Sequence, residues 1–162
     1  MQFVTAIQYM DSPAGLLKIT AGETGITAVS FCEHITENES PSFLTKQCAH
    51  QLLEYMEGSR KLFELPLQVQ GTPFQQRVWD KLLTIPFGKT CTYHELAVAL
   101  GDPKCIRAAG TANGRNPIAV IIPCHRVIGT HGELTGYAGG LPRKKWLLDH
   151  EARVSGTFSR LF

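Results

Sequence analysis

The sequence predicts an α+β protein made of two domains, residues 1–70 and 71–162. Two observations lead to this prediction. The first part combines short apolar segments of strand periodicity with one long helical segment. From Gly71 onward the pattern changes to a series of helices, several of which begin with a capping motif. The chain of 162 residues, 43% hydrophobic and 19% charged, has the size and composition of an ordinary globular protein with a real core.

Three segments of the first domain have the apolar and β-branched composition of strands: Ala6–Met10, Leu16–Ala21 and Ile26–Phe31. The turn sequences DSPAG and GETG separate them. Because such short turns join neighbouring strands that run in opposite directions, we expect a small antiparallel sheet.

A helix is predicted from about Ser42 to Glu57, because apolar residues recur there at helical spacing and Gly58 supplies a stop. The next segment, LFELPLQVQ (residues 62–70), alternates apolar and polar side chains as a strand does. Pro66 cannot donate a hydrogen bond to a ladder, so we expect this strand at a sheet edge.

The second domain opens with two helices that carry capping boxes. Thr72 can cap the first helix while Gln75 reaches back to it, with Pro73 at the first helical position. Thr92 and Glu95 repeat the arrangement in a second helix, which is expected to end near residue 100.

A tight turn, Gly101 to Pro103, leads into a third helix that runs toward Gly114, with Asp102 as its cap. Two short helices joined by a turn containing Gly form a helix-turn-helix pattern, which is found in DNA-binding domains and also in helical hairpins that bind no DNA. The third helix reads RAAGTANG from Arg107, a run of small side chains behind one long cation. Small side chains allow close approach of the backbone, either to a neighbouring helix or to a nucleic-acid groove that Arg107 would enter as a wedge.

The charges are divided unevenly between the two parts of the chain. Residues 1–71 hold four Lys/Arg and eight Asp/Glu, a net charge of −4, whereas residues 72–151 hold ten and six, a net charge of +4. This asymmetry is either chance scatter of solvated side chains or the mark of a domain that binds a polyanion.

The sequence also indicates a location. No apolar run approaches the ~20 residues that cross a bilayer, and the first residues lack the features of a signal peptide. The five cysteines are an odd number without a C-x-x-C pair, which argues against a disulfide framework. We therefore expect a protein of the reducing cytoplasm with no membrane partner.

The apolar run Ile118–Ile122 predicts an extended, buried segment that ends at Pro123, with Cys124 and His125 directly behind it. The residues themselves leave three interpretations of the cysteine open: a small buried thiol, a zinc ligand, or a nucleophile. In the third case the pair would resemble that of a cysteine hydrolase, with Glu151 available to orient the histidine.

Two further Cys-x-His fragments are candidate metal ligands, Cys32-x-His34 and Cys48-x-His50. Neither matches a standard zinc pattern, which normally brings four ligands together at recognisable spacing. We therefore assign no metal to the chain.

Three segments together resemble the O6-alkylguanine-DNA alkyltransferases, a family of direct-reversal DNA repair proteins. They are TPFQQRVWDKLLTIPFGKTCTYHELA, RAAGTANGRNPIAVIIPCHRVIG and GYAGGLPRKKWLLDHE. The most specific feature is P-C-H-R-V with N-P upstream and G-Y-x-G-G downstream. The resemblance implies a mostly helical, winged-helix-like second domain with a helix-turn-helix and no cofactor. It also implies a monomer that acts on double-stranded DNA containing O6-alkylguanine, and possible activity on O4-alkylthymine.

The resemblance implies five catalytic residues: Tyr93 and Asn116, which support the reaction, and a central group of three. Cys124 is the alkyl acceptor, His125 the base that takes its proton through a water, and Glu151 the carboxylate that orients the histidine. The product is a thioether with no good leaving group, so each molecule would repair one base.

Residues for DNA binding follow from the same resemblance, since the thiol can reach the base only after it is flipped from the duplex. Arg107 matches the arginine that fills the gap, Tyr93 the tyrosine that contacts the flipped nucleotide, and Asn116 the asparagine that ties the turn before the cysteine segment. The remaining residues assigned to DNA binding are small or flank the tyrosine: Ala108, Gly110 and Ala112 on the small face of the helix, and Thr92 and His94.

The implied base pocket consists of Pro123, Val127 with its backbone carbonyl, and a loop with Tyr137, Ala138 and Gly139. Some members of the family have serine where this chain has Ala138, so a contact to O6 there would have to come from a backbone N–H. Relatives that lack the cysteine only bind damaged DNA, and they define the rival interpretation of a non-catalytic lesion sensor.

Overall fold

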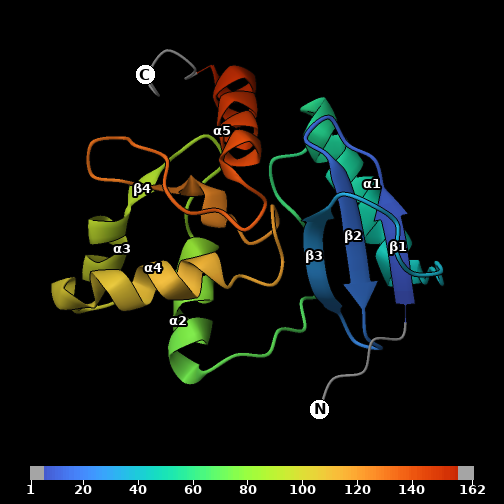
Figure 1. Cartoon of the computed structure of the whole chain (residues 1–162), viewed down its shortest axis with the longest axis horizontal. Helices are drawn as coiled ribbons and strands as arrows, with labels where there is room; N and C mark the ends of the chain where they lie inside the picture. The colour runs from blue at the N-terminus through green and yellow to red at the C-terminus, as the bar shows by residue number, and fades with distance from the viewer. Residues whose placement is uncertain (1–5, 157–162) are drawn as a thin grey trace. The chain divides into compact units, whose positions relative to one another are not determined.

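The computed structural model describes residues 6–156, and the chain divides into two compact units (Figure 1). Unit 1 contains the described residues up to Gln70 together with Pro117–Ile121. Unit 2 contains Gly71–Asn116 and the described residues from Ile122 onward. The change from one unit to the other after Gln70 falls at the residue where the sequence changes its pattern.

Unit 1 is built on a three-stranded antiparallel sheet in the order β1-β2-β3. The strands are β1 (Ala6–Met10), β2 (Leu16–Ala21) and β3 (Ile26–Cys32). The predicted antiparallel sheet is confirmed, and β3 extends one residue beyond the expected end.

Helix α1 (Phe43–Glu57) packs against β1 and β2 within unit 1 (Figure 1). Ser42 caps it, with Thr45 completing a capping box, and Gly58 ends it in the left-handed conformation at φ 87°. The helix and the sheet enclose a core of fully buried side chains that includes Leu17, Ile19, Ile26, Cys48, Leu52 and Tyr55.

The strand predicted over residues 62–70 is wrong in its extent. Only Leu67 takes part in pairing, through a single parallel bridge to Ile26. The Ile26 N–H donates to the Pro66 carbonyl at 2.8 Å, and the Gln68 N–H donates to the Ile26 carbonyl at 2.8 Å. Pro66 has no N–H of its own, which stops the ladder at this point.

Unit 2 contains α2 (Pro73–Leu82), β4 (Cys91–Thr92), α3 (Tyr93–Ala99) and α4 (Ile106–Gly114). Both predicted capping boxes are confirmed, since Thr72 pairs with Gln75 and Thr92 with Glu95. Local side-chain chemistry therefore sets the starts of both helices.

Helices α3 and α4 form the predicted helix-turn-helix, with one correction to its second helix. The helix expected from Pro103 begins as a short 3-10 turn, η1 (Pro103–Cys105), where the Asp102 carboxylate accepts from the Lys104 N–H at 2.9 Å. The α-helix itself starts at Ile106.

The segment before Cys124 is buried, as predicted, but only Ile118 pairs as a strand residue, through a parallel bridge to Val29, and the segment is not extended beyond Ala119. Val120 is fully buried with a φ of 70°, and the Ile121 N–H donates to the Ala119 carbonyl at 2.8 Å. This bond across a residue with positive φ is a γ-turn of the rare, strained kind. A second γ-turn, of the common inverse type, follows at Pro123 (φ −82°, ψ 61°). The β-branched composition favoured a strand, but consecutive tight turns replace it.

After these turns the chain forms η2 (Cys124–Arg126) and β5 (Val127–Ile128), which pairs in parallel with β4. Helix α5 (Leu141–Ser155) completes the unit and ends at Gly156 in the left-handed conformation. Over residues 6–156, no helix combines the length and the apolar character that a membrane crossing requires.

Candidate active site

Cys124 lies at the first position of η2 and is only 7% exposed. Two asparagines from the end of α4 hold the backbone around it. The Asn116 side chain donates to the Ile122 carbonyl at 2.7 Å, and the Asn113 side chain donates to the Cys124 carbonyl at 3.4 Å. The C-terminal end of α4 and the residues just after it are therefore tied to the cysteine segment by side-chain amides.

His125 is fully buried next to Glu151 of α5, with 2.7 Å between His125 Nε2 and Glu151 Oε2. The same carboxylate accepts two bonds from the Arg126 guanidinium, at 2.8 Å from Nε and 3.0 Å from Nη2. The Gly88 N–H also donates to it at 3.1 Å, and Arg126 Nη1 donates to the Ile85 carbonyl at 2.6 Å. One buried carboxylate thus receives four donors, which fixes the histidine ring.

The charges of this network favour an ionised carboxylate beside a neutral imidazole. Although burial opposes it, the hydrogen bonds from His125 and Arg126 and the charge of the Arg126 guanidinium hold the pKa of Glu151 well below its usual range. Burial lowers the pKa of His125, and Glu151 only partly opposes this shift. His125 Nδ1 is buried and has no hydrogen-bond partner among the described residues, so a neutral ring bound through Nε2–H leaves this nitrogen able to accept a proton.

The thiol of Cys124 is in an environment that disfavours its charged form. Burial raises the pKa of Cys124, and a hydrogen bond from Asn116 and the charge of Lys144 oppose that shift. A buried thiol reacts slowly unless a nearby base or cation supports the thiolate. The site therefore needs both an acceptor for the proton and a partner for the charge.

The loop between β5 and α5 carries Tyr137, which is half-buried, and a turn in which the Gly140 N–H donates to the Tyr137 carbonyl at 2.9 Å. Burial raises the pKa of Tyr137, and the second cause of this shift is the charge of Cys124. Tyr137 is therefore a neighbour of the thiol. Ala138 is exposed and Gly139 is half-buried.

Tyr93, the first residue of α3, connects the helix-turn-helix to this loop. Its hydroxyl donates to the Thr135 carbonyl at 2.9 Å. Its ring lies against Gly110 of α4, because a Cβ built on Gly110 would be 3.6 Å from the ring. The absence of a side chain at Gly110 thus leaves the ring in close contact with the helix backbone.

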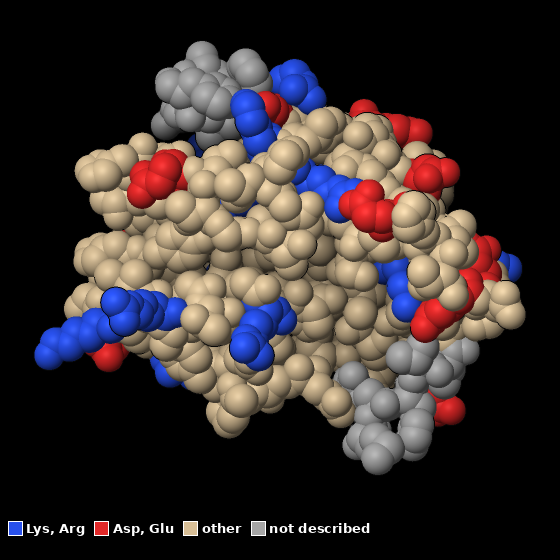
Figure 2. Space-filling view, viewed as in Figure 1, with Lys and Arg blue, Asp and Glu red and all other residues tan. Residues whose placement is uncertain are grey.

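The exposed surface of α4 begins with Ile106 and Arg107 and continues with small residues as far as Arg115, the residue that follows the helix. Its exposed members are Ile106, Arg107, Ala108, Thr111 and Gly114. Figure 2 shows basic side chains over the α4 side of unit 2, whereas acidic side chains predominate over unit 1. His94 of α3 is exposed as well.

Two expectations for this surface are changed by the structure. Ala112 is 2% exposed, and its carbonyl accepts from Trp79 Nε1 at 3.0 Å, so it faces the core and Thr111 takes its expected place. The Thr92 hydroxyl accepts from the Glu95 N–H at 3.0 Å, so its first role is to cap α3.

Sequence reasoning missed three buried residues of the site, Asn113, Arg126 and Lys144. Lys144 is fully buried and donates to the Val127 carbonyl at 2.7 Å, the group that was expected to bind guanine. A signal for it existed, because Lys144 precedes Leu147, Leu148 and Glu151 at the spacing of one helix face, and all three are buried.

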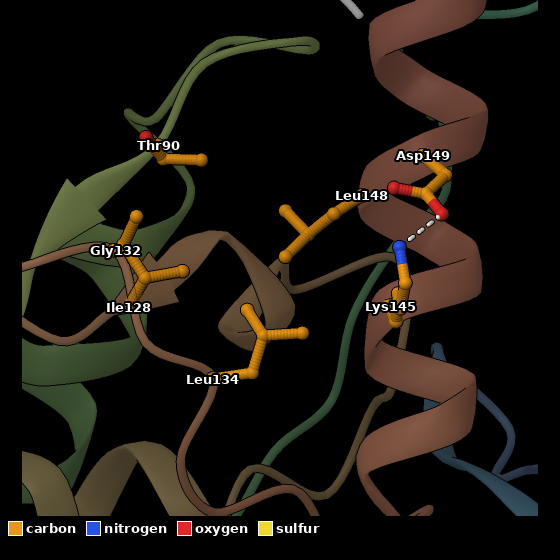
Figure 3. Close-up of a pocket in the computed structure, with 7 residues that line it drawn as sticks. All are labelled: Thr90, Ile128, Gly132, Leu134, Lys145, Leu148 and Asp149. Carbon is orange, nitrogen blue, oxygen red and sulfur yellow. Dashed lines mark hydrogen bonds and ion pairs between the residues drawn. The ribbon is translucent and has the colours of Figure 1, made fainter. Parts of the chain in front are cut away.

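The pocket in Figure 3 is distinct from this site and contains none of the predicted residues. It lies between α5 and the loop after β5 and has a cavity volume of about 70 Å³. Its lining residues are Thr90, Ile128, Gly132, Leu134, Lys145, Leu148 and Asp149, with Lys145 and Asp149 paired at 2.9 Å. Its size is too small for a flipped base.

The cysteines provide no metal centre in the described part of the chain. All five are free thiols, and residues 6–156 contain no group of three or more His, Cys, Asp or Glu side chains that could hold a metal ion.

Comparisons with known proteins give consistent results for both units. Residues 6–69 match the family described as 6-O-methylguanine DNA methyltransferase, ribonuclease-like domain, and residues 73–153 match the DNA binding domain of the same family. The methylated-DNA–protein-cysteine methyltransferase of Methanosarcina barkeri is 44% identical over 148 residues, covering 88% of this chain and 94% of the relative.

Solved structures agree with these relatives. The O6-methylguanine methyltransferase of Mycobacterium tuberculosis has a TM-score of 0.83 at 42% identity, covering 91% of this chain and 93% of the other. A structure described as Mycobacterium tuberculosis OGT in complex with DNA has the same TM-score and identity, covering 96% and 98%. With both domains matched in order and relatives above 40% identity over most of its length, the chain belongs to the 6-O-methylguanine DNA methyltransferase family.

Proposed function

We propose that this protein repairs double-stranded DNA by transferring the alkyl group of O6-alkylguanine to Cys124, once per molecule. The observation that carries the proposal is the buried arrangement of Cys124, His125 and Glu151, in a chain whose relatives are named methylated-DNA–protein-cysteine methyltransferases. O4-alkylthymine, which presents an alkyl group on a similar oxygen, is a second substrate under the same proposal.

In the proposed step, the Cys124 thiolate attacks the alkyl carbon. The new sulfur–carbon bond forms as the carbon–O6 bond breaks, and its electron pair leaves with the guanine. The proton lost by the thiol balances the proton that the guanine takes up. A thioether has no good leaving group, so no second step regenerates the thiol.

His125 is the proposed base. The Glu151 carboxylate accepts from Nε2–H and holds the ring so that Nδ1 carries the lone pair. The lowered pKa of His125 keeps the imidazole neutral before the reaction, which a base requires. Arg126 in turn keeps the carboxylate ionised and in place.

The exposed face of α4 is the proposed contact to DNA. Small side chains at Ala108, Gly110 and Thr111 allow the helix backbone to approach a minor groove, and Arg107 is long enough to fill the gap left by a flipped base. Tyr93 and the loop with Tyr137 are the proposed walls of the base pocket. The contacts between Tyr93, Gly110 and Thr135 support this assignment because they join α3, α4 and that loop.

The proposal is tested by incubating the protein with duplex DNA that contains O6-methylguanine and digesting it for mass spectrometry. We expect one methyl group per molecule, on the peptide that contains Cys124. A methyl group on another cysteine, on none, or on more than one site would contradict the proposal. Multiple turnover on an ester or peptide would favour a cysteine hydrolase instead.

A non-catalytic lesion sensor is the alternative function. Cys124→Ala separates the two, because it abolishes transfer and leaves DNA binding nearly intact if the protein is an alkyltransferase. A sensor would show the same binding and the same absence of transfer with and without the substitution.

We further infer that the protein is a monomer of the reducing cytoplasm, with domains at residues 1–70 and 71–162. The five free thiols support the reducing compartment, and the change of unit after Gln70 supports the domain boundary. Light scattering at several protein concentrations tests the monomer, since a mass that rises above one chain would contradict it.

A further inference from the structure

Lys144 of α5 is a fully buried amine to which the mechanism above gives no role. Its Nζ donates to three backbone carbonyls, at 2.7 Å to Val127, 2.9 Å to Thr135 and 3.4 Å to Gly136. An ammonium has three donors, and here all three are used. Carbonyl oxygens satisfy its hydrogen bonds but do not neutralise its charge.

The other charges of the site balance one another. Glu151 is paired with the Arg126 guanidinium, and His125 is neutral. Among the described residues no ion pair joins Lys144 to a carboxylate, so its positive charge is not balanced by one. A buried charge without a partner is unfavourable by several kcal/mol unless something compensates it. Cys124 becomes that compensating group when its thiol ionises.

The titration behaviour of the two residues is mutual. Burial lowers the pKa of Lys144 to about 8, and the Cys124 thiolate is the group that opposes this shift. Lys144 in turn opposes the rise that burial causes in the pKa of Cys124. The other groups around the pair are Asn116, which donates to the thiol, Tyr137, and His125, whose pKa the charge of Lys144 helps to lower. The ring of Tyr93 faces Lys144, with 5.8 Å between Nζ and the ring centroid.

Lys144 of α5 also contacts two other segments of the unit. It connects β5, through Val127, to the loop that precedes Tyr137, through Thr135 and Gly136. The Thr135 carbonyl accepts from the Tyr93 hydroxyl as well, so α3 is attached to the same point.

We propose that Lys144 is the counter-charge of the Cys124 thiolate and the residue that positions the Tyr137 loop against β5. The inference deepens the proposed alkyl transfer and rests on it for its biological meaning. It makes Lys144 a positioning residue that acts on the reacting sulfur through its charge.

The first test measures the rate at which Cys124 reacts with iodoacetamide from pH 5 to pH 10, followed on its own peptide by mass spectrometry. Lys144→Met removes the charge and keeps the length, and Lys144→Arg keeps the charge. The matched control is Lys145→Met, which removes the exposed neighbouring lysine that pairs with Asp149 outside the site (Figure 3).

We expect Lys144→Met to move the midpoint of the pH–rate profile upward by a pH unit or more, so that the rate below both midpoints falls about tenfold. The rates should converge at alkaline pH, because the thiolate then forms without help. Lys144→Arg should retain the midpoint to a large degree, and Lys145→Met should leave it in place. An unchanged midpoint for Lys144→Met, an equal slowing at every pH, or an equal shift in the Lys145→Met control would overturn the proposal.

A second test uses the unsubstituted protein, so it stands even if Lys144→Met does not fold. The side-chain amine resonances of lysines labelled with ¹⁵N are titrated before and after methylation of Cys124. Because the coupling between two charges is reciprocal, loss of the thiolate should lower the pKa of the buried lysine. An unchanged value would refute the pairing.

These measurements use no DNA, so their failure is distinguishable from failure of the proposed function. A protein that repairs O6-methylguanine but shows no effect in either test retains the function without the counter-charge. If the tests show the pairing but no alkyl group is transferred from DNA, the counter-charge proposal stands and the proposed function fails.

Discussion

The two units bury different kinds of polar side chains. In unit 1 the buried polar residues are neutral: Thr20, Thr45 and Gln51. In unit 2 the buried polar residues include the charged or titratable side chains His125, Arg126, Lys144, His150 and Glu151. Burial of a charge is unfavourable unless the charge is paired. Among the described residues, buried charged side chains lie only in unit 2, which is the unit that contains the candidate active site.

Gln51 illustrates the difference. Its amide is paired twice with the backbone of Glu64, donating at 3.1 Å and accepting at 2.8 Å. No charge is involved, so the pairing serves only to join α1 to the segment that contains Glu64. Glu151 is as well satisfied, but its partners are a guanidinium and an imidazole next to a thiol. Gln51 makes two of these hydrogen bonds and Glu151 accepts four, and only those of Glu151 involve a buried charge.

The largest expected difference is between two buried cysteines, Cys124 in unit 2 and Cys48 in unit 1, in their effect on the rate of alkyl transfer. We expect Cys124→Ser to lower the rate of alkyl transfer by about 10⁴-fold or more, because removal of a nucleophile eliminates the covalent step. Cys48→Ser in α1 should leave the single-turnover rate unchanged and reduce only stability. Rapid-quench measurements with O6-methylguanine duplex compare the two. Equal losses of rate would remove the distinction between the units.

An arginine–glutamate pair in each unit allows the next comparison. Glu151→Gln should reduce the free energy of unfolding of unit 2 by about 3–5 kcal/mol, because it leaves the buried Arg126 without its counter-charge. Glu54→Gln, which weakens the partly exposed pair with Arg60 at 2.9 Å, should cost about 1 kcal/mol or less.

Urea titration checks both variants. Tryptophan fluorescence reports on unit 2, since both tryptophans, Trp79 and Trp146, lie there, and circular dichroism reports on the whole chain. Similar small losses for the two variants would show that burial does not set the value of these pairs.

Acid should destabilise unit 2 more than unit 1. The folded-state pKa of Glu151 lies below its ordinary value, so its contribution is fully present above about pH 4.3 and is lost as the pH falls further. The folded-state pKa of His125 is also lowered, so below about pH 6.5 the unfolded chain binds a proton that the folded chain refuses. Both effects make stability fall with decreasing pH.

The urea midpoint by tryptophan fluorescence, followed from pH 7 down to about pH 2, measures this trend. Glu151→Gln should flatten the lower part of the profile, because it removes the titrating carboxylate. A profile that is flat in the unsubstituted protein would contradict the buried charges as its cause.

The smallest of the expected effects concerns exposed cations on helices. Arg107→Ala in α4 should slow repair of duplex substrate by about tenfold to a hundredfold, because the variant lacks the side chain proposed to fill the gap left by the flipped base. Its reaction with free O6-methylguanine base should change little. Lys46→Ala in α1 removes an exposed charge from unit 1 and should affect neither. Equal losses on duplex and free base would refute a flipping role for Arg107.

In both units the sequence predicted the elements that depend on local patterns. The limits of β1, β2 and α1, and the capping boxes at Thr72 and Thr92, depend on neighbouring residues and were read correctly. The strand predicted over residues 62–70 failed because alternation alone does not supply a partner with free ladder positions. Local patterns therefore predict elements well, and they predict pairing where a short turn joins the strands, as in β1, β2 and β3, but not where the partner is distant in the sequence.

The site residues that belong to a recognisable motif could be predicted from the sequence. The residues whose place depends on packing could not. Cys124, His125 and Glu151 were assigned from the family resemblance, and the last two lie 2.7 Å apart. Lys144 was missed because a charged residue in a basic stretch normally indicates an exposed position. Only its place on the helix face with Leu147 indicated burial.

The γ-turn at Val120 limits how this protein can be stabilised by redesign. Backbone geometry alone recommends glycine, since a φ of 70° costs a β-branched residue about 1–2 kcal/mol. The side chain is fully buried, however, and removing it forfeits about 1.5–3 kcal/mol of burial. The strain at Val120 and the burial of its side chain are therefore of similar size, and a procedure that scores torsion angles alone would leave out the packing that a glycine loses.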